Sequence, residues 1–278
     1  MENAVNFTSQ SFGKRLGSML KVDLRRMRRS RLFYILVAIA LVIPILMTVM
    51  MTMMDGTESK NPQTGEITVM QGPENTWQSI GTPETNAEEK GEEEASPMGG
   101  MDVMAMCNIN MMFMLVSVFV CLFISDDFRS GYAKNLFTVR ARKGDYVISK
   151  TLCGFLCGAC MLIAYFVGAV LGGAICSLSF DLGSLSAFNL VMCMLAKICL
   201  MLVFVAIFTL IAVSARQRAW LSICGSLGGG MLLFMMVPMI TPLGSTPIHL
   251  LLCLAGGAMF AVGLGAISKT VLNRCALV

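Results

Sequence analysis

The sequence predicts an all-α polytopic membrane protein with six transmembrane helices preceded by a basic amphipathic interfacial helix. The first observation is composition, since 56% of the 278 residues are hydrophobic and 14% are charged, whereas soluble domains carry about 25% charged residues. The second is a set of six apolar runs, each long enough to cross a bilayer core. The third is the gathering of basic residues in alternate loops. These features exclude a soluble enzyme, and we expect no nucleic-acid partner.

Residues 1–31 are predicted to form a cytoplasmic N-terminal interfacial helix. They contain eight Lys or Arg residues. The apolar residues recur at spacings of three and four and define one helical face: Phe12, Leu16, Met19, Leu20, Leu24 and Met27. Basic residues fill the other face, which is typical of a helix lying on a membrane surface. The alternative is a basic topology signal without a defined helix.

The membrane-spanning body is predicted over residues 32–278. Its six spans are expected at about 32–54, 103–124, 152–178, 185–213, 219–240 and 249–267. Pro44 lies in the middle of the first span and predicts a kink there.

An acidic loop, residues 55–100, separates the first two spans. It holds ten acidic residues against Lys60 and Lys90, together with four prolines. So few aliphatic residues cannot form a tight core alone, and we expect its glutamate-rich part, 88–94, to be solvated. A loop that captures a metal ion or a peptide is the alternative interpretation.

The distribution of basic residues predicts the orientation. Eight lie in the N-terminal segment, six in 125–150, two between the fourth and fifth spans, and two in the tail, whereas the alternate loops hold only Lys60 and Lys90. Because positively charged loops stay in the cytoplasm, both termini are predicted to be cytoplasmic.

Cysteine, methionine and glycine are abundant within the spans. Cys153, Cys157 and Cys160 share a helical face, and we favour small packing residues over a metal site there. Methionines gather at the outer ends of the first two spans, where a Cu(I) site, an adaptable lining for amphipathic cargo and ordinary packing all remain open. Glycine pairs four residues apart predict close helix packing, within the bundle or between subunits.

No catalytic motif is found in the sequence. It has no GxxxxGK[ST] phosphate loop and no HExxH motif, and His249 is its single histidine. No acidic residue lies inside a predicted span, which disfavours a proton relay. We therefore expect a protein that is not an enzyme and that carries no cofactor itself.

Lys197 is the one ionisable residue predicted inside a span. A charge near the bilayer centre is costly, so two interpretations stay open. Lys197 either packs within the bundle, or it forms a polar site on a substrate pathway.

The long polar segment 125–150 is predicted to be a cytoplasmic docking element. Phe128, Tyr132 and Leu136 recur every four residues and form a short apolar stripe that suits a partner's groove. Arg129 and Lys134 flank the stripe and suit an acidic rim. A membrane-hugging loop without a partner is the alternative.

The layout and this segment together resemble ABC-2-type permeases, the type-2 export class of ABC transporters. The positions that carry the resemblance are Asp127, Gly131, Lys134, Asn135, Arg142 and Lys150. The resemblance implies a coupling helix that contacts a separate ATPase subunit, which holds ATP and Mg²⁺, and a second permease chain, identical or not. The implied contact residues are Asp127, Phe128, Arg129, Gly131, Tyr132, Lys134, Asn135, Leu136 and Arg142.

The same resemblance implies a function. Relatives of this class often export amphipathic peptides, drugs or lipids from the bacterial cytoplasmic membrane and give resistance to antimicrobial peptides. A non-transporting membrane sensor or immunity protein, whose acidic loop captures a cationic ligand, is the alternative. A stand-alone secondary transporter fits less well, because the spans lack acidic residues.

Overall fold

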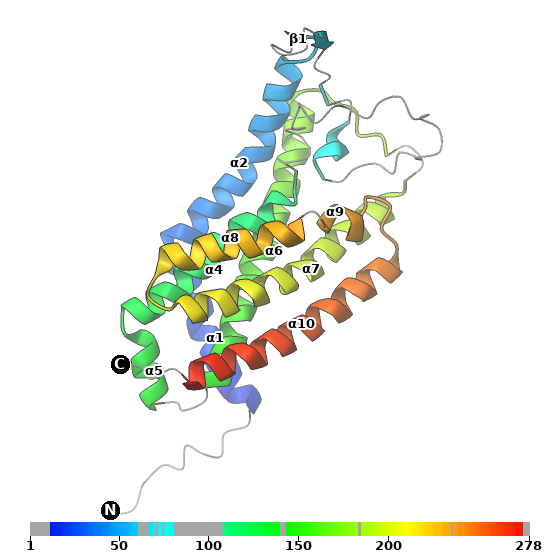
Figure 1. The fold of residues 1–278 in the computed structure, drawn as a ribbon. Helices are drawn as coiled ribbons and strands as arrows, with labels where there is room; N and C mark the ends of the chain where they lie inside the picture. The colour runs from blue at the N-terminus through cyan, green and yellow to red at the C-terminus, as the bar shows by residue number, and fades with distance from the viewer. Residues whose placement is uncertain are drawn as a thin grey trace, which may run out of the picture.

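The computed structural model is a bundle of long helices (Figure 1). It describes residues 12–60, 67–69, 72–73, 75–80, 108–139, 143–182, 185–234 and 236–274. Five of its helices are long and apolar enough to cross a membrane, and one further apolar helix is shorter. The predicted all-α, multi-span class is therefore confirmed.

The described elements are numbered as in Figure 1. The described helices are α1 (Phe12–Arg29), α2 (Arg31–Met53), α4 (Met111–Arg129), α5 (Tyr132–Val139), α6 (Lys143–Ile175), α7 (Ala187–Ala215), α8 (Ala219–Phe234), α9 (Val237–Ile240) and α10 (Pro247–Arg274). Between α2 and α4 lie the strands β1 (Glu58–Lys60) and β2 (Ile67–Val69) and the 3-10 helix η2 (Thr76–Ser79).

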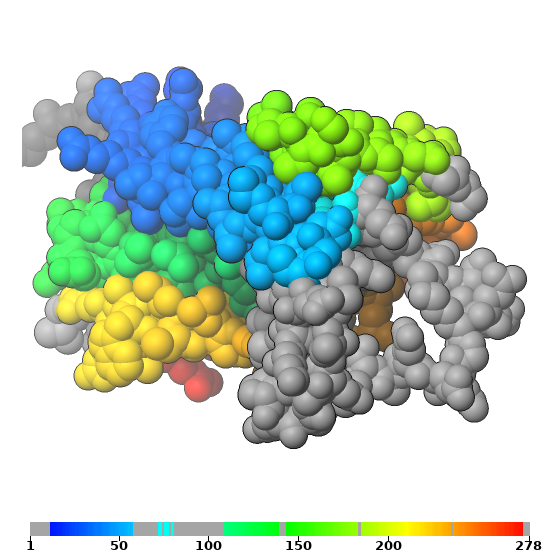
Figure 2. Space-filling view, turned by 90° about the horizontal axis from the view of Figure 1, so that it is seen from above, coloured from blue at the N-terminus to red at the C-terminus, as the bar shows by residue number. Residues whose placement is uncertain are grey.

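The helices define two ends of the bundle. We call the end that carries α1, α5, the α7–α8 turn and the end of α10 the basic end (Figure 1). The opposite end carries β1, β2 and η2, and we call it the loop end. On one face, α4 lies between α2 and α8 (Figure 2). The apolar side of α10 that faces away from α7 is largely exposed, with Val262 at 74%.

The predicted fifth span, 219–240, is not one continuous helix. Helix α8 ends at Phe234, and α9 starts at Val237 with Pro238 in its first turn. Proline has no amide hydrogen, and its ring collides with the carbonyl four residues earlier. For Pro238 that carbonyl belongs to Phe234, so the helix ends where the proline requires.

Helix α1 packs against α6 instead of presenting its whole apolar face to lipid. Its buried residues are Met19, Asp23 and Met27, spaced by four. Ser30 interrupts the helix before α2 begins. The predicted helix in the N-terminal segment is present, and its position at a membrane surface stays a prediction.

Glycines allow α2 and α6 to approach closely. A β-carbon at Gly168 would overlap the Leu41 carbonyl oxygen, and one at Gly172 would lie 3.2 Å from the Ile45 Cα. Pro44 faces the same contact and is accommodated inside a helix that runs unbroken from Arg31 to Met53. This glycine pair therefore serves packing within the chain.

Other glycines have the same role around α7. A β-carbon at Gly158 would lie 2.6 Å from the Met201 Cγ, and one at Gly257 would lie 3.0 Å from the Cys199 carbonyl oxygen. By contrast, nothing lies within 4 Å of a β-carbon at Gly265. Gly158 of α6 and Gly257 of α10 therefore serve helix packing within the chain.

The described part of the loop between α2 and α4 is tied to α6 and to the residues that follow it. The Trp77 ring stacks on Phe166 with centroids 6.2 Å apart, and its Nε1 donates a hydrogen bond to the Phe180 carbonyl at 3.2 Å. The Asn75 side chain donates to the Asp181 carbonyl. The glutamate-rich stretch 88–94 lies outside the described residues.

Candidate functional site

The polar segment 125–150 folds as the end of α4, a turn, α5 and the start of α6. The turn contains Gly131 at φ +73°, a left-handed conformation that glycine adopts without strain. Phe128 therefore lies on α4, while Tyr132 and Leu136 lie on α5. The predicted continuous stripe of these three residues is wrong, because the turn separates the first from the other two.

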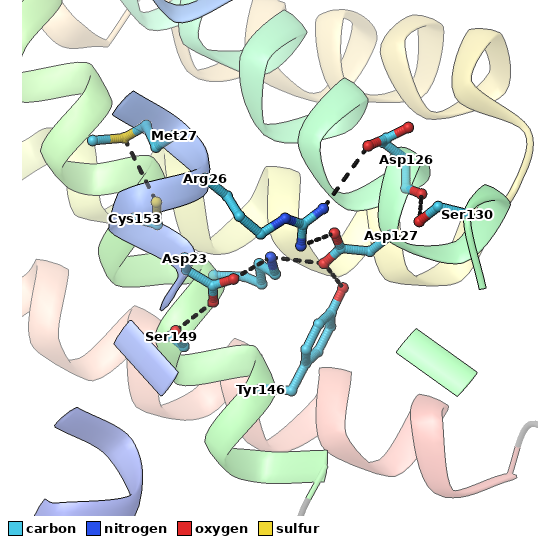
Figure 3. A network of polar contacts seen from close by, with 10 residues as sticks. Asp23, Arg26, Met27, Asp126, Asp127, Ser130, Tyr146, Ser149 and Cys153 are labelled. Carbon is cyan, nitrogen blue, oxygen red and sulfur yellow. Dashed lines mark hydrogen bonds and ion pairs between the residues drawn. The ribbon is translucent and has the colours of Figure 1, made fainter. Parts of the chain in front are cut away.

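Asp127 joins three helices at the base of this segment (Figure 3). Its side chain is 0% exposed, and its Oδ1 lies 2.6 Å from Nη1 of Arg26 on α1. Its Oδ2 lies 2.7 Å from the Lys150 ammonium and accepts a hydrogen bond from the Tyr146 hydroxyl at 3.0 Å, both on α6. Asp127 is thus the shared partner of α1 and α6.

A second buried carboxylate completes the cluster. Asp23 on α1 is 0% exposed and accepts hydrogen bonds from the Lys150 ammonium at 2.8 Å and the Ser149 hydroxyl at 2.6 Å. Two carboxylates therefore face two cations, Arg26 and Lys150. We call Asp23, Arg26, Asp127 and Lys150 the ionic cluster.

Aromatic rings cover the two cations. The Arg26 guanidinium lies 4.2 Å from the Tyr132 ring centroid, and the Lys150 ammonium lies 4.1 Å from that of Phe123. Such contacts favour a cation that has lost water. Because Tyr132 belongs to α5, the short helix is attached to the cluster through a ring.

The carboxylates of the cluster favour the charged form of Arg26. Burial acts to lower the pKa of Arg26, and the neighbouring carboxylates, Asp127 foremost, outweigh it, so this pKa is raised. A buried ion pair gains little over an apolar replacement, but removing one partner leaves an uncompensated charge and costs about 3–5 kcal/mol. The cluster therefore favours one arrangement of α1, α4 and α6 and penalises the others.

Two further contacts fasten the start of α6. Arg15 on α1 pairs with Asp145 at 3.3 Å. The Lys143 ammonium donates to the Leu272 carbonyl at 2.7 Å, near the end of α10. The last part of segment 125–150 is thus linked to the first and last described helices.

The predicted contact residues divide by exposure. Arg129, Lys134 and Asn135 are exposed, whereas Phe128, Gly131, Tyr132 and Leu136 are partly buried. Asp127 has no exposed surface, so within this single chain it positions the segment and offers no direct contact to a partner. Arg142 lies outside the described residues.

Lys197 is fully buried near the loop end of α7. Its ammonium donates to Asn110 Oδ1 at 2.8 Å and to Thr241 Oγ1 at 3.0 Å. Asn110 precedes α4, and Thr241 follows α9. The lysine thus joins three helical regions through neutral partners, one of which, Thr241, caps the end of α9.

Three cysteines of α6 were considered above as possible metal ligands. Cys153 and Cys157 are buried in the bundle, whereas Cys160 is exposed. No group of three or more His, Cys, Asp or Glu residues in the described ranges is arranged to hold a metal ion.

Sequence reasoning missed Asp23, Arg26, Tyr146 and Ser149. A signal for Asp23 was present, because it lies midway between Met19 and Met27 on the apolar face of α1. An acid in an apolar stripe needs a buried partner. Its partner, Lys150, is 127 residues away, and no local pattern connects them.

Comparison with protein families decides the class of the chain. The model of the ABC-2 family transporter protein matches residues 80–232, more than half of the chain. The chain belongs to the ABC-2 transporter family. Comparison with curated proteins and with solved structures finds no match. The predicted resemblance is thereby confirmed at the level of the family.

Membership of the ABC-2 family indicates the kind of complex to which this chain belongs. It is a membrane component of an ABC transporter, and permeases of this family generally work with an ABC ATPase subunit. The matched range contains Asp127 and Lys150, whereas Asp23 and Arg26 lie before it. Half of the ionic cluster of this permease therefore lies outside the matched range.

Proposed function

We propose that this chain is the membrane subunit of an ATP-driven exporter, and that α5 passes the motion of a separate ATPase subunit to the bundle through the ionic cluster. The proposal rests on the family and on one observation. Asp127, at the end of α4, is ion-paired to both α1 and α6 while α5 stays exposed beside it.

The exposed face of α5 is the proposed contact. Lys134 and Asn135 face solvent there, and Arg129 is exposed just before the turn. A partner with an acidic rim matches these cations. Force applied to α5 reaches Arg26 through the Tyr132 ring, and it reaches α4 through the turn at Gly131.

The basic end is proposed to face the cytoplasm. It carries the basic residues of α1, α5, the α7–α8 turn and the end of α10, as a positive-inside arrangement requires. In this orientation both termini are cytoplasmic and the acidic loop is outside. ATP and Mg²⁺ belong to the partner subunit, and the membrane is that of a bacterial cell.

The cargo is proposed to be an amphipathic peptide, drug or lipid. At the loop end of α2, Met50, Met53 and Met54 are exposed to 49%, 78% and 38%. Methionine side chains are flexible and adapt to apolar surfaces of varied shape. Such a surface suits cargo that leaves the bundle at this end.

The experiment uses the complex purified from its native membrane in a mild detergent. Lys134→Glu reverses one exposed charge of α5 and lies outside the ionic cluster. We expect co-purification of the ATPase subunit, and cargo-stimulated ATP hydrolysis, to fall at least five-fold while the Tm of the permease stays unchanged. Lys21→Glu, an exposed reversal on α1, is the control.

Two results would contradict the proposal. If Lys134→Glu and Lys21→Glu bind the ATPase subunit and stimulate it like the parent, α5 is not the contact. If a cysteine placed at position 134 reacts with an impermeant reagent from outside intact cells, the orientation is wrong.

A further inference from the structure

A basic groove opens at the basic end between two turns. One wall is the α4–α5 turn with Arg129 and Lys134, and the other is the α7–α8 turn with Arg216 and Arg218. The cavity measures about 640 Å³. That volume falls in the range of small-molecule sites.

The four cations of the groove have no acidic partner among the residues that the structure describes. All four are exposed, and none forms an ion pair with a carboxylate in the described ranges. No described aspartate or glutamate lines the groove. Like charges held around one cavity repel each other, and an anion placed between them removes that repulsion.

One of these four cations, Arg216, has an unusual backbone conformation. Arg216 has φ +52°, a left-handed conformation that is strained for residues other than glycine. Strain of this kind tends to occur at functional sites. Here it lies in the turn that forms the groove wall.

One edge of the groove is apolar and continues onto the outside of α8. Leu221 lines the groove and is 41% exposed, and Trp220 beside it is 67% exposed. Leu232, further along the same apolar helix, is 80% exposed. Tryptophan is enriched where a membrane meets water, so this edge fits the headgroup level of a bilayer.

We propose that the groove binds an anionic phospholipid, with its phosphate-bearing headgroup between the two basic walls and an acyl chain along α8. Basic pockets between transmembrane helices on the cytoplasmic side bind such headgroups. The acidic rim of the proposed ATPase subunit accounts for Arg129 and Lys134, but it leaves Arg216, Arg218 and the apolar edge at Leu221 without an occupant. A bound headgroup bridges the turn of the coupling segment and the α7–α8 turn, and it thereby links lipid composition to the position of α5.

The test uses Trp220 as the reporter. Trp77→Phe leaves Trp220 as the single tryptophan of the full-length chain, which is reconstituted in phosphatidylcholine vesicles. A tenth of the lipid is replaced by brominated phosphatidylglycerol or, in parallel, by brominated phosphatidylcholine. We expect the phosphatidylglycerol probe to quench Trp220 fluorescence at least three-fold more.

Two matched variants locate the site. Arg216→Gln with Arg218→Gln should abolish the preference. Arg25→Gln with Arg28→Gln, which removes the same charge from exposed positions on α1, should retain it. If Trp77→Phe does not fold, the fluorescence of Trp220 is obtained instead by subtracting the emission spectrum of Trp220→Phe from that of the parent chain.

Four outcomes would overturn the proposal. Equal quenching by both lipids shows that the groove has no preference for an anionic headgroup. A preference that both paired variants lose equally shows attraction by overall charge without a site. A preference absent in vesicles, together with loss of ATPase co-purification in the Arg216 and Arg218 variant alone, assigns the groove to an acidic protein partner. Inorganic phosphate at 50 mM that protects the groove arginines from a guanidine-modifying reagent, without any lipid preference, assigns it to free phosphate.

Discussion

Lys150 is the residue through which the two carboxylates of the ionic cluster are joined. Its ammonium contacts Asp23 at 2.8 Å and Asp127 at 2.7 Å, and it is 0% exposed. Without it, two buried carboxylates face a single guanidinium, that of Arg26. The uncompensated charge then has no access to water.

Replacing Lys150 is therefore expected to destabilise the fold strongly. Lys150→Met keeps most of the length of the side chain and removes its charge, at a cost of about 3–5 kcal/mol. For a chain of this size that corresponds to a fall in Tm of roughly 6–20 °C. Thermal unfolding of the purified chain in detergent measures it.

A control and a compensating change make this prediction specific. Lys134→Met removes the same charge from an exposed position and should alter the free energy of unfolding by less than about 0.5 kcal/mol. Adding Asp23→Asn to Lys150→Met restores neutrality and should recover part of the loss. If the double variant is less stable than Lys150→Met alone, charge balance does not hold the cluster together.

Lys197 is expected to act as a brace at the loop end. Lys197→Met leaves Asn110 and Thr241 without their shared donor, so it should lower the Tm and reduce transport of every cargo by a similar factor. Transport of several cargoes by the reconstituted complex, with Tm measured in parallel, checks this. A change in the relative rates of two cargoes would instead support the alternative role on the substrate pathway.

Single important residues could be recognised from the sequence, but the residues that they contact could not. Lys197 was singled out as the ionisable residue inside a span, but Asn110 and Thr241 are 87 and 44 residues away. Asp127 was taken from a family pattern, and its burial depends on helices that pack from both sides. Tertiary contacts of this kind leave no periodic trace in the sequence.

At the scale of elements, helix starts and stops followed local chemistry that the apolar pattern concealed. Gly131 and Pro238 were visible as breakers, yet apolar residues continue at helical spacing across both positions. Periodicity reports which side chains are apolar, whereas a positive φ or a missing amide hydrogen decides where a helix ends. The expectation of a continuous helix therefore fails for the same reason at the α4–α5 turn and after α8.

The contact between α2 and α6 gives a prediction at this scale. Gly168→Ala places a methyl group against the Leu41 carbonyl oxygen, and backbone cannot move aside as a flexible side chain does. We expect a loss of about 1–3 kcal/mol, as in an overpacked core, measured by thermal unfolding. Gly256→Ala in α10 is the control, because nothing lies within 4 Å of its β-carbon. Equal effects at the two positions would show that close helix approach is not what Gly168 provides.

For the whole molecule, the class was predictable because composition and positive charge distribution reflect the membrane as a solvent. The cargo was not, because an adaptable apolar surface carries no pattern of donors and acceptors specific to one ligand. The partner falls between these cases. Family membership implies an ATPase subunit. The number of chains in the complex depends also on the surfaces of the partner subunits, which this sequence does not contain.

The complex is predicted to contain two permease chains and two ATPase subunits. Helix α10 leaves a broad apolar side uncovered, and the described chain has no phosphate loop of its own. The mass of the complex extracted in a mild detergent, determined by light scattering with subtraction of the detergent, gives the stoichiometry. A single chain that drives cargo across sealed vesicles without ATP would refute the prediction.

The distance along the chain between Asp23 and Lys150 has a consequence for how the protein is made. The two residues are 127 positions apart, so the ribosome delivers the lysine roughly 6–25 s after the aspartate at about 5–20 residues per second. Throughout that interval α1 carries a carboxylate without its partner and cannot settle on a helix that has not emerged. Docking of the first helix must therefore wait until about half of the chain has been made, and a chain that ends before α6 lacks Ser149 and Lys150, the two donors to Asp23.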